Sequence, residues 1–337
     1  MSSTRQRHVW AIGLFAIKLA GTIGFLWWVL SGLEENESLG RSFQTALRSP
    51  LWVAYGLSMA LISLVANAVR WQFLLWAQSI HQPFSYILRL TFYGAFFNIA
   101  SFGSAAGDAV KIFLLMRREP EKKLGVTISV MVDHVIGIVA TCFIFLVFTW
   151  GFGTLDNATG PEARTAFIAA TWFQVGGLTL TLLSVLSCAP PMLAIGRRIV
   201  PRLINNRWVA SIATALDLHR RRWRFAFYAL LASFAFSATY YLTFHAGLRS
   251  LGSDIPATTV MAVMPIVDVI AALPISVSGL GVREQAFDFL LHLLTGIETS
   301  QAVAASLIGF LFQLFWGLVG GLVFLTARSR KPILPCS

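Results

Sequence analysis

Two charged residues follow a stretch that cannot form one continuous helix. Residues 274–284 read PISVSGLGVRE, in which proline ends a helix and serines and glycines precede Arg283 and Glu284. These charges lie in an apolar region, where ionised side chains are costly and usually functional. Because a guanidinium at a helix start can hold two phosphate oxygens, we expect Arg283 to bind phosphate. The alternative is that Arg283 only stabilises the fold by pairing with Glu284 or Asp268.

A second interrupted stretch carries an acid and a base one helical turn apart. Asn98 precedes a run of small residues, and Gly107 is followed by Asp108 and Lys111. Asp108 suits the start of a helix, where free backbone N–H groups and a nearby ammonium group can bind phosphate. The alternative is that the glycines form a packing face and that Asp108 and Lys111 neutralise each other.

Further polar residues lie inside apolar runs. Asp133 and His134 could relay a proton or hold a head group, or could form a structural hydrogen bond. Arg70 lies toward one end of its apolar run, so we expect its side chain to reach the membrane surface. The residues expected to contact a substrate are Asn98, Ser104, Gly107, Asp108, Lys111, Asp133, His134, Asp268, Ser276, Ser278, Gly279, Gly281, Arg283 and Glu284.

The composition excludes a soluble globular protein. Of the 337 residues, 56% are apolar and only 12% are charged, against about 25% charged in soluble domains. A spanning helix needs about 20 apolar residues, and six runs meet this requirement. They are residues 9–30, 51–77, 124–150, 165–188, 225–248 and 300–327.

Two more apolar regions, residues 84–116 and 257–296, are each long enough for a helical hairpin and are broken by small residues. Basic residues in short loops mark the cytoplasmic side, and they predict that both termini are cytoplasmic and that the two regions enter from opposite faces. Opposed broken helices are typical of transporters built from inverted repeats. We therefore predict an all-α, polytopic membrane protein with six full spans and two re-entrant hairpins. The alternative is two pairs of ordinary spans.

We expect residues 1–337 to form a single integral membrane domain. Residues 190–224 are a basic cytoplasmic connector or an amphipathic helix at the membrane interface. The net charge of +11 is explained by loop arginines and lysines beside the apolar runs, so we expect no nucleic-acid partner. The sequence predicts no metal site and no cofactor, because it has no ligand motif and only three widely spaced cysteines.

These motifs carry a resemblance to a known family. Asn98 with the Gly107-Asp108-x-x-Lys111 pattern, the pair Asp133-His134 and the stretch 274–284 resemble the lysylphosphatidylglycerol synthase transmembrane-region family. The stretch 274–284 is the specific part. In that family the first motif usually has an acidic residue and then arginine, and the middle pair is commonly acidic-arginine, so Lys111 and His134 are departures.

The resemblance implies a stand-alone, flippase-like protein of a bacterial-type cytoplasmic membrane, acting on a lipid with an anionic head group. It could act as a homo-oligomer or beside a separate lipid-synthesising enzyme. We do not expect synthase activity, which in the family belongs to a separate soluble domain. The alternative function is a membrane-embedded enzyme that modifies a lipid phosphate, with Asp133 and His134 as acid and base and Arg283 as electrophile.

Overall fold

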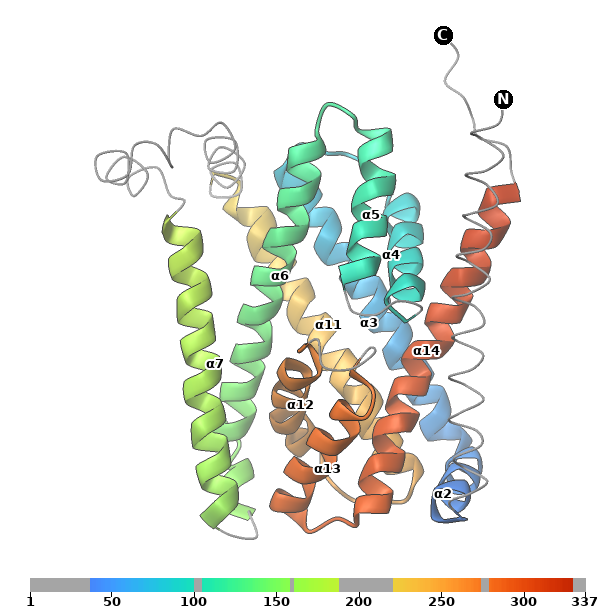
Figure 1. The fold of residues 1–337 in the computed structure, drawn as a ribbon, viewed down its shortest axis with the longest axis vertical. Helices are drawn as coiled ribbons and strands as arrows, with labels where there is room; N and C mark the ends of the chain where they lie inside the picture. Colours follow the sequence, from blue (N-terminus) through green and yellow to red (C-terminus); the bar gives the residue numbers. More distant parts are fainter. Residues whose placement is uncertain (1–36, 100–104, 158–160, 188–220, 274–278, 330–337) are drawn as a thin grey trace.

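The computed structural model describes residues 37–99, 105–157, 161–187, 221–273 and 279–329 (Figure 1). These residues are helical with short turns, and no strand occurs among them. The α-helices are α2 (Glu37–Leu47), α3 (Pro50–Ala77), α4 (Phe84–Ile99), α5 (Ala105–Arg118), α6 (Lys123–Leu146), α7 (Pro161–Ser187), α11 (Trp223–Ser250), α12 (Ala257–Ala271), α13 (Val282–Thr295) and α14 (Thr299–Ser329). A π-helix, η1 (Val147–Gly151), continues α6, and a 3₁₀ turn, η2 (Thr154–Asn157), follows it.

Five of the described helices are long and apolar enough to cross a membrane. They are α3, α6 with η1, α7, α11 and α14, and they confirm five of the six predicted spans. The predicted span 9–30 lies outside the described residues, as do Ser104, Ser276, Ser278 and most of residues 190–224. Helix α2 was not predicted, because its 11 residues are too polar to produce a spanning pattern. The chain is an integral membrane protein.

Each interrupted region forms two short antiparallel helices. Helices α4 and α5 have 16 and 14 residues, and α12 and α13 have 15 and 14, all fewer than the roughly 20 needed to cross a bilayer. Figure 1 shows α4 and α5 at one end of the long helices and α12 and α13 at the other. The two hairpins therefore occupy opposite halves of the helical bundle.

The start of α13 explains one of the breaks. Gly281 has φ of +78°, a left-handed conformation that favours glycine. Its backbone N–H donates to Oε2 of Glu284 at 2.6 Å, which satisfies one of the free donors at the helix start. Glu284 therefore caps α13, in addition to any role in binding.

The two long helices α3 and α11 pack along one another at the centre of the bundle. Helix α14 packs on α4, and α6 packs on α12, so each hairpin contacts a long helix from the other half of the chain. Gly317 and Gly321 of α14 lie against Ile99 and Phe96 of α4. Small residues of this kind can pack helices within one chain or between two chains. These two glycines pack α14 against α4 of the same chain.

Basic residues gather at one end of the bundle. The α5–α6 turn, the start of α11 and the end of α14 lie at the same end in Figure 1. The α5–α6 turn and the start of α11 carry Arg117, Arg118, Lys122, Lys123, Arg221, Arg222 and Arg224. Arg222 also donates hydrogen bonds to the carbonyl oxygens of Trp76 and Ala77 at 3.1 and 3.3 Å, which caps the end of α3.

Candidate functional site

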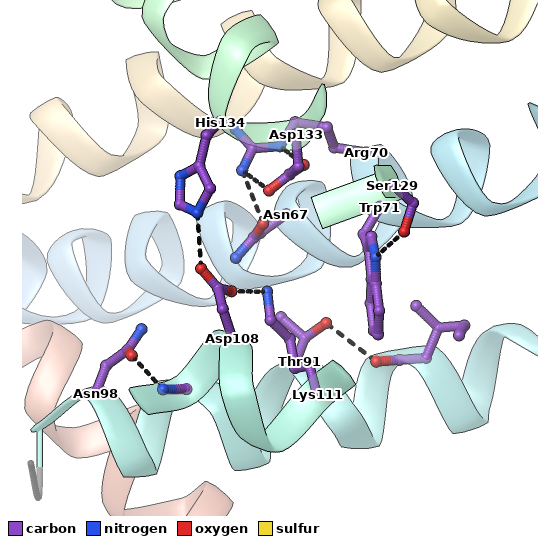
Figure 2. Close-up of polar contacts among 12 residues, drawn as sticks. Asn67, Arg70, Trp71, Thr91, Asn98, Asp108, Lys111, Ser129, Asp133 and His134 are labelled. Atoms are coloured by element: carbon purple, nitrogen blue, oxygen red, sulfur yellow. Dashed lines mark hydrogen bonds and ion pairs between the residues drawn. The ribbon is translucent and has the colours of Figure 1, made fainter. Parts of the chain in front are cut away.

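Two groups of charged side chains lie beside each other, one joining α3 to α6 and the other joining α5 to α6 (Figure 2). Arg70 of α3 contacts Asp133 of α6 twice, through Nε to Oδ1 at 2.6 Å and through Nη2 to Oδ2 at 2.7 Å. Both side chains are buried. The remaining guanidinium donors reach Oδ1 of Asn67 at 3.2 Å and Oγ of Ser233 at 3.1 Å, which brings α11 into the same network.

Asp108, in the first turn of α5, links the hairpin to α6. Its Oδ1 lies 2.6 Å from Nζ of Lys111, and its Oδ2 lies 3.0 Å from Nε2 of His134. Figure 2 shows Asp108 between these two partners. Lys111 is buried, whereas 63% of the His134 side chain is exposed. The network therefore reaches from the interior to the outer surface of the described helices.

A contact with an aromatic ring helps to fix the position of Lys111. Its ammonium group lies 5.2 Å from the ring centroid of Trp71, a cation–π contact. The indole of Trp71 in turn donates to Oγ of Ser129 at 3.1 Å. Lys111 is thus held by an anion on one side and an aromatic ring on the other.

The two helices of the first hairpin approach each other closely at Gly107. Its N–H donates to Oδ1 of Asn98 at 2.7 Å. A Cβ atom at Gly107 would collide with the carbonyl oxygen of Gly94 and with the Asn98 side chain. Asn98 and Gly107 therefore bind α4 to α5 immediately before the charged residues.

A second polar cluster lies at the start of the other hairpin. Arg283 is buried and lies over the ring of Phe310 at 5.1 Å. The Asp268 carboxyl group interacts with the charge of Arg283 and with the hydroxyl groups of Tyr240 and Tyr241. Direct pairing of Asp268 with Arg283 stays a prediction.

Gly279 and Glu284 complete the description of this cluster. Gly279 lies so close to the Arg283 side chain that an added Cβ would be 3.3 Å from Nη2. Glu284 is buried, and its Oε1 has no hydrogen-bond partner among the described residues. A buried carboxylate oxygen without a partner is uncommon, and such groups often mark functional sites.

One expectation about the first cluster is corrected. Arg70 does not reach the membrane surface, because its guanidinium is buried against Asp133. Asp133 and His134 form structural contacts across helices, which was one of the interpretations of this pair, and they do so with different neighbours: Asp133 faces Arg70, while His134 faces Asp108. Adjacent residues on a helix point about 100° apart, so they contact different neighbours.

Asn67 and Ser233, which accept hydrogen bonds from Arg70, were not predicted from the sequence. A signal for the Arg70–Asp133 pair was present, because two opposite charges inside separate apolar spans usually pair. No comparable signal identified Asn67 or Ser233. Asp108 and Lys111 form the self-neutralising pair that was one of the two interpretations.

The sequence matches the family described as Lysylphosphatidylglycerol synthase TM region over residues 12–321. The chain belongs to this family. No curated protein and no solved structure matches it. The resemblance found in the motifs is therefore confirmed, and the chain is a membrane protein of a family related to lipid modification and flipping.

Proposed function

We propose that this family member is a flippase that moves a lipid with a phosphate-bearing head group, either a phospholipid or a polyprenyl-linked lipid, between leaflets. One observation carries the proposal. Each of the two opposed hairpins brings a buried cation into the bundle from the first half of its second helix, Lys111 in α5 and Arg283 in α13. A phosphate between the hairpins would have a cationic partner from each side of the membrane.

The order of the elements supports an inverted repeat. A 28-residue helix, α3, precedes a hairpin of 16 and 14 residues and the long helix α6. A 28-residue helix, α11, precedes a hairpin of 15 and 14 residues and the long helix α14. Two halves of opposite orientation would offer equivalent routes to the two leaflets. We propose that both hairpins are re-entrant.

The charges suggest how a phosphate would be held and released. In the first cluster, Arg70 and Lys111 balance Asp133 and Asp108, which lowers the cost of burying these ions away from water. In the second cluster, Arg283 lies near Asp268 and over an aromatic ring. We propose that Arg283 makes the principal phosphate contact. The phosphate and Asp268 then compete for the Arg283 guanidinium. Acyl or prenyl chains remain in lipid throughout.

Transport in this proposal requires no group transfer. Closure of one hairpin while the other opens exposes the head group to one leaflet at a time, driven by an ion gradient or by the lipid gradient itself. We place the protein in a bacterial-type cytoplasmic membrane with both termini and the basic end in the cytoplasm. An enzyme that supplies the lipid on the cytoplasmic side is the expected partner.

The test uses purified full-length protein in liposomes that contain fluorescent phosphatidylglycerol. Addition of the impermeant reductant dithionite bleaches only the outer leaflet. We expect bleaching to pass well beyond the outer-leaflet fraction with protein present and to stop at that fraction with heat-denatured protein. Extracted lipids are analysed by mass spectrometry in parallel. A chemically altered lipid would instead support the enzyme alternative, and bleaching limited to the outer leaflet would refute the flippase proposal.

A further inference from the structure

His134 is exposed on the outer side of α6, far from either end of this helix. His134 follows the first residue of α6, Lys123, by eleven positions, which at 1.5 Å per residue is about 16 Å along the helix. With Lys123 at the edge of a hydrocarbon core about 30 Å thick, His134 would lie near the middle of that core. Its side chain is 63% exposed.

Apolar, exposed residues lie one turn from His134 on α6 and on the neighbouring helix α5. Met131 and Ile138, one turn away on the same face of α6, are 55% and 43% exposed. On the neighbouring helix α5, Phe113 is 58% exposed and Ala109 is exposed. We call these five residues the α5–α6 seam. A polar ring in the middle of such a surface is costly if only acyl chains cover it.

Behind the seam, His134 is joined to the Asp108–Lys111 ion pair. Nε2 faces Oδ2 of Asp108 at 3.0 Å, and the same carboxylate holds Lys111. The second ring nitrogen, Nδ1, has no hydrogen-bond partner among the described residues. Arg70 and Lys111 balance Asp108 and Asp133, so a protonated His134 leaves one net positive charge on this network, which complements a phosphate.

We infer that the α5–α6 seam is a lateral binding site for one membrane lipid, with its phosphate at Nδ1 of His134 and its chains along Phe113, Met131 and Ile138. The inference rests on the proposed function and adds to it the route by which the head group enters. The head group passes beside α5 and α6, and the tails stay outside the bundle. His134 is then the first polar contact of the lipid, before Lys111 and Arg283.

Photolabelling tests this site separately from transport. Full-length protein in phosphatidylglycerol liposomes receives one of two diazirine analogues of that lipid, with the diazirine on the head group or at the end of an acyl chain. Trypsin cleavage after Lys123 and Arg164 releases the peptide 124–164, and mass spectrometry locates the adduct. We expect the head-group probe to label residues 131–138, and we expect unlabelled phosphatidylglycerol to compete.

Two variants complete the test. His134→Ala should lower head-group labelling of residues 131–138 by about tenfold, the loss expected for one charge-assisted hydrogen bond. Phe143→Ala, the matched control on the same helix, removes a 56% exposed apolar side chain outside the seam and should leave the labelling within about twofold, since one apolar contact in lipid contributes little. Acyl-probe labelling of exposed Trp172 and Phe173 on α7 should be the same in all samples if the protein is folded.

The outcomes separate the inference from the proposed function. Labelling of residues 131–138 by the acyl probe alone, or head-group labelling that survives His134→Ala, would overturn the lateral site. Lipid movement in the dithionite assay without head-group labelling would also overturn it, while leaving the flippase proposal intact. Head-group labelling that depends on His134 in a protein that moves no lipid would support the site and refute the flippase proposal.

Discussion

Arg70 and Asp133 are 63 residues apart in the chain, yet their side chains meet in two contacts of 2.6 and 2.7 Å between buried groups. The pair joins α3 to α6, and Ser233 extends the contact to α11. A buried ion pair contributes little compared with a well-packed apolar pair, but the loss of one partner leaves an uncompensated charge. Removal of one of the two residues is therefore expected to destabilise the protein more than removal of both.

We predict that Arg70→Met lowers the free energy of unfolding by about 3–5 kcal/mol, the usual cost of leaving a buried charge without its partner. The double variant Arg70→Met/Asp133→Leu should recover most of this loss. Arg249→Met is the control, because its ion pair with Asp254 is exposed and should contribute less than about 1 kcal/mol. Denaturant or thermal unfolding in detergent measures all three. Equal loss in the single and double variants would contradict the prediction.

We predict that Arg283→Ala reduces lipid movement by about tenfold or more while the protein still inserts and folds, because one charge-assisted contact to phosphate is lost. Arg283→Lys should retain part of the activity, since lysine keeps the charge but cannot form the bidentate hydrogen bonds of a guanidinium. The initial rate in the dithionite assay and the gel-filtration profile are measured together. Full activity in Arg283→Ala, or a loss that only follows aggregation, would refute the role of Arg283.

Gly107 and Gly176 provide a matched pair of helical glycines. Alanine normally gains about 1 kcal/mol over glycine inside a helix. At Gly176 nothing lies within 4 Å of the new Cβ, so Gly176→Ala should be neutral or stabilising. At Gly107 the Cβ collides with the backbone of Gly94 and with Asn98, so Gly107→Ala should destabilise by about 1–3 kcal/mol. Equal unfolding midpoints for the two variants would show that α4 and α5 are not closely packed.

Cysteine labelling tests the opposed hairpins. In a background without Cys142, Cys188 and Cys336, a cysteine replaces either Ala106 of α5, which is half-buried, or Ala272 after α12, which is exposed. We expect a membrane-impermeant maleimide to reach Ala106→Cys from the cytoplasmic side and Ala272→Cys from the outer side, because re-entrant hairpins line wet cavities. Labelling of both sites from one side of the membrane in a single locked state would contradict opposed hairpins.

Asp268→Asn should strengthen phosphate binding and slow transport. Loss of the acid frees Arg283 from a competing anion, and a lipid that is held more strongly leaves more slowly. We therefore expect both the apparent half-saturation concentration and the maximal flux of an anionic lipid to fall, with Asp254→Asn, which is exposed, as the control. If binding weakens instead, Asp268 contacts an amine or a hydroxyl group of the head group directly.

The sequence predicted the helical architecture better than it predicted the contacts between side chains. Apolar runs of 20 or more residues identified the described spans, and Pro274 with the neighbouring glycines indicated the second break, because these are local properties of the chain. The local pattern identifies Arg70 and Asp133 as opposite charges in two separate spans, but it does not show that these two spans are neighbours. The same reason explains why Asp133 and His134, adjacent in sequence, were interpreted as one unit.

The first hairpin illustrates the same limit. The ion pair of Asp108 and Lys111 was one of the two interpretations of their spacing, because residues three apart lie on one helical face. The contact of Asp108 with His134 joins α5 to α6 and required the tertiary structure. The unexpected capping role of Glu284 is local, and its position three residues after Gly281 is a recognisable capping pattern.

The long contact between α3 and α11 has a consequence for biosynthesis. Trp76 and Arg222, which join the ends of these helices, are 146 positions apart, so at about 5–20 residues per second the ribosome needs about 7–30 s to deliver the partner of α3. During this interval Arg70 is already in the bilayer without Ser233, and Asp133 emerges first. The nascent chain therefore acquires its ion pair before its central helix pair, and a ribosome paused between α3 and α6 would hold an unneutralised arginine in the membrane.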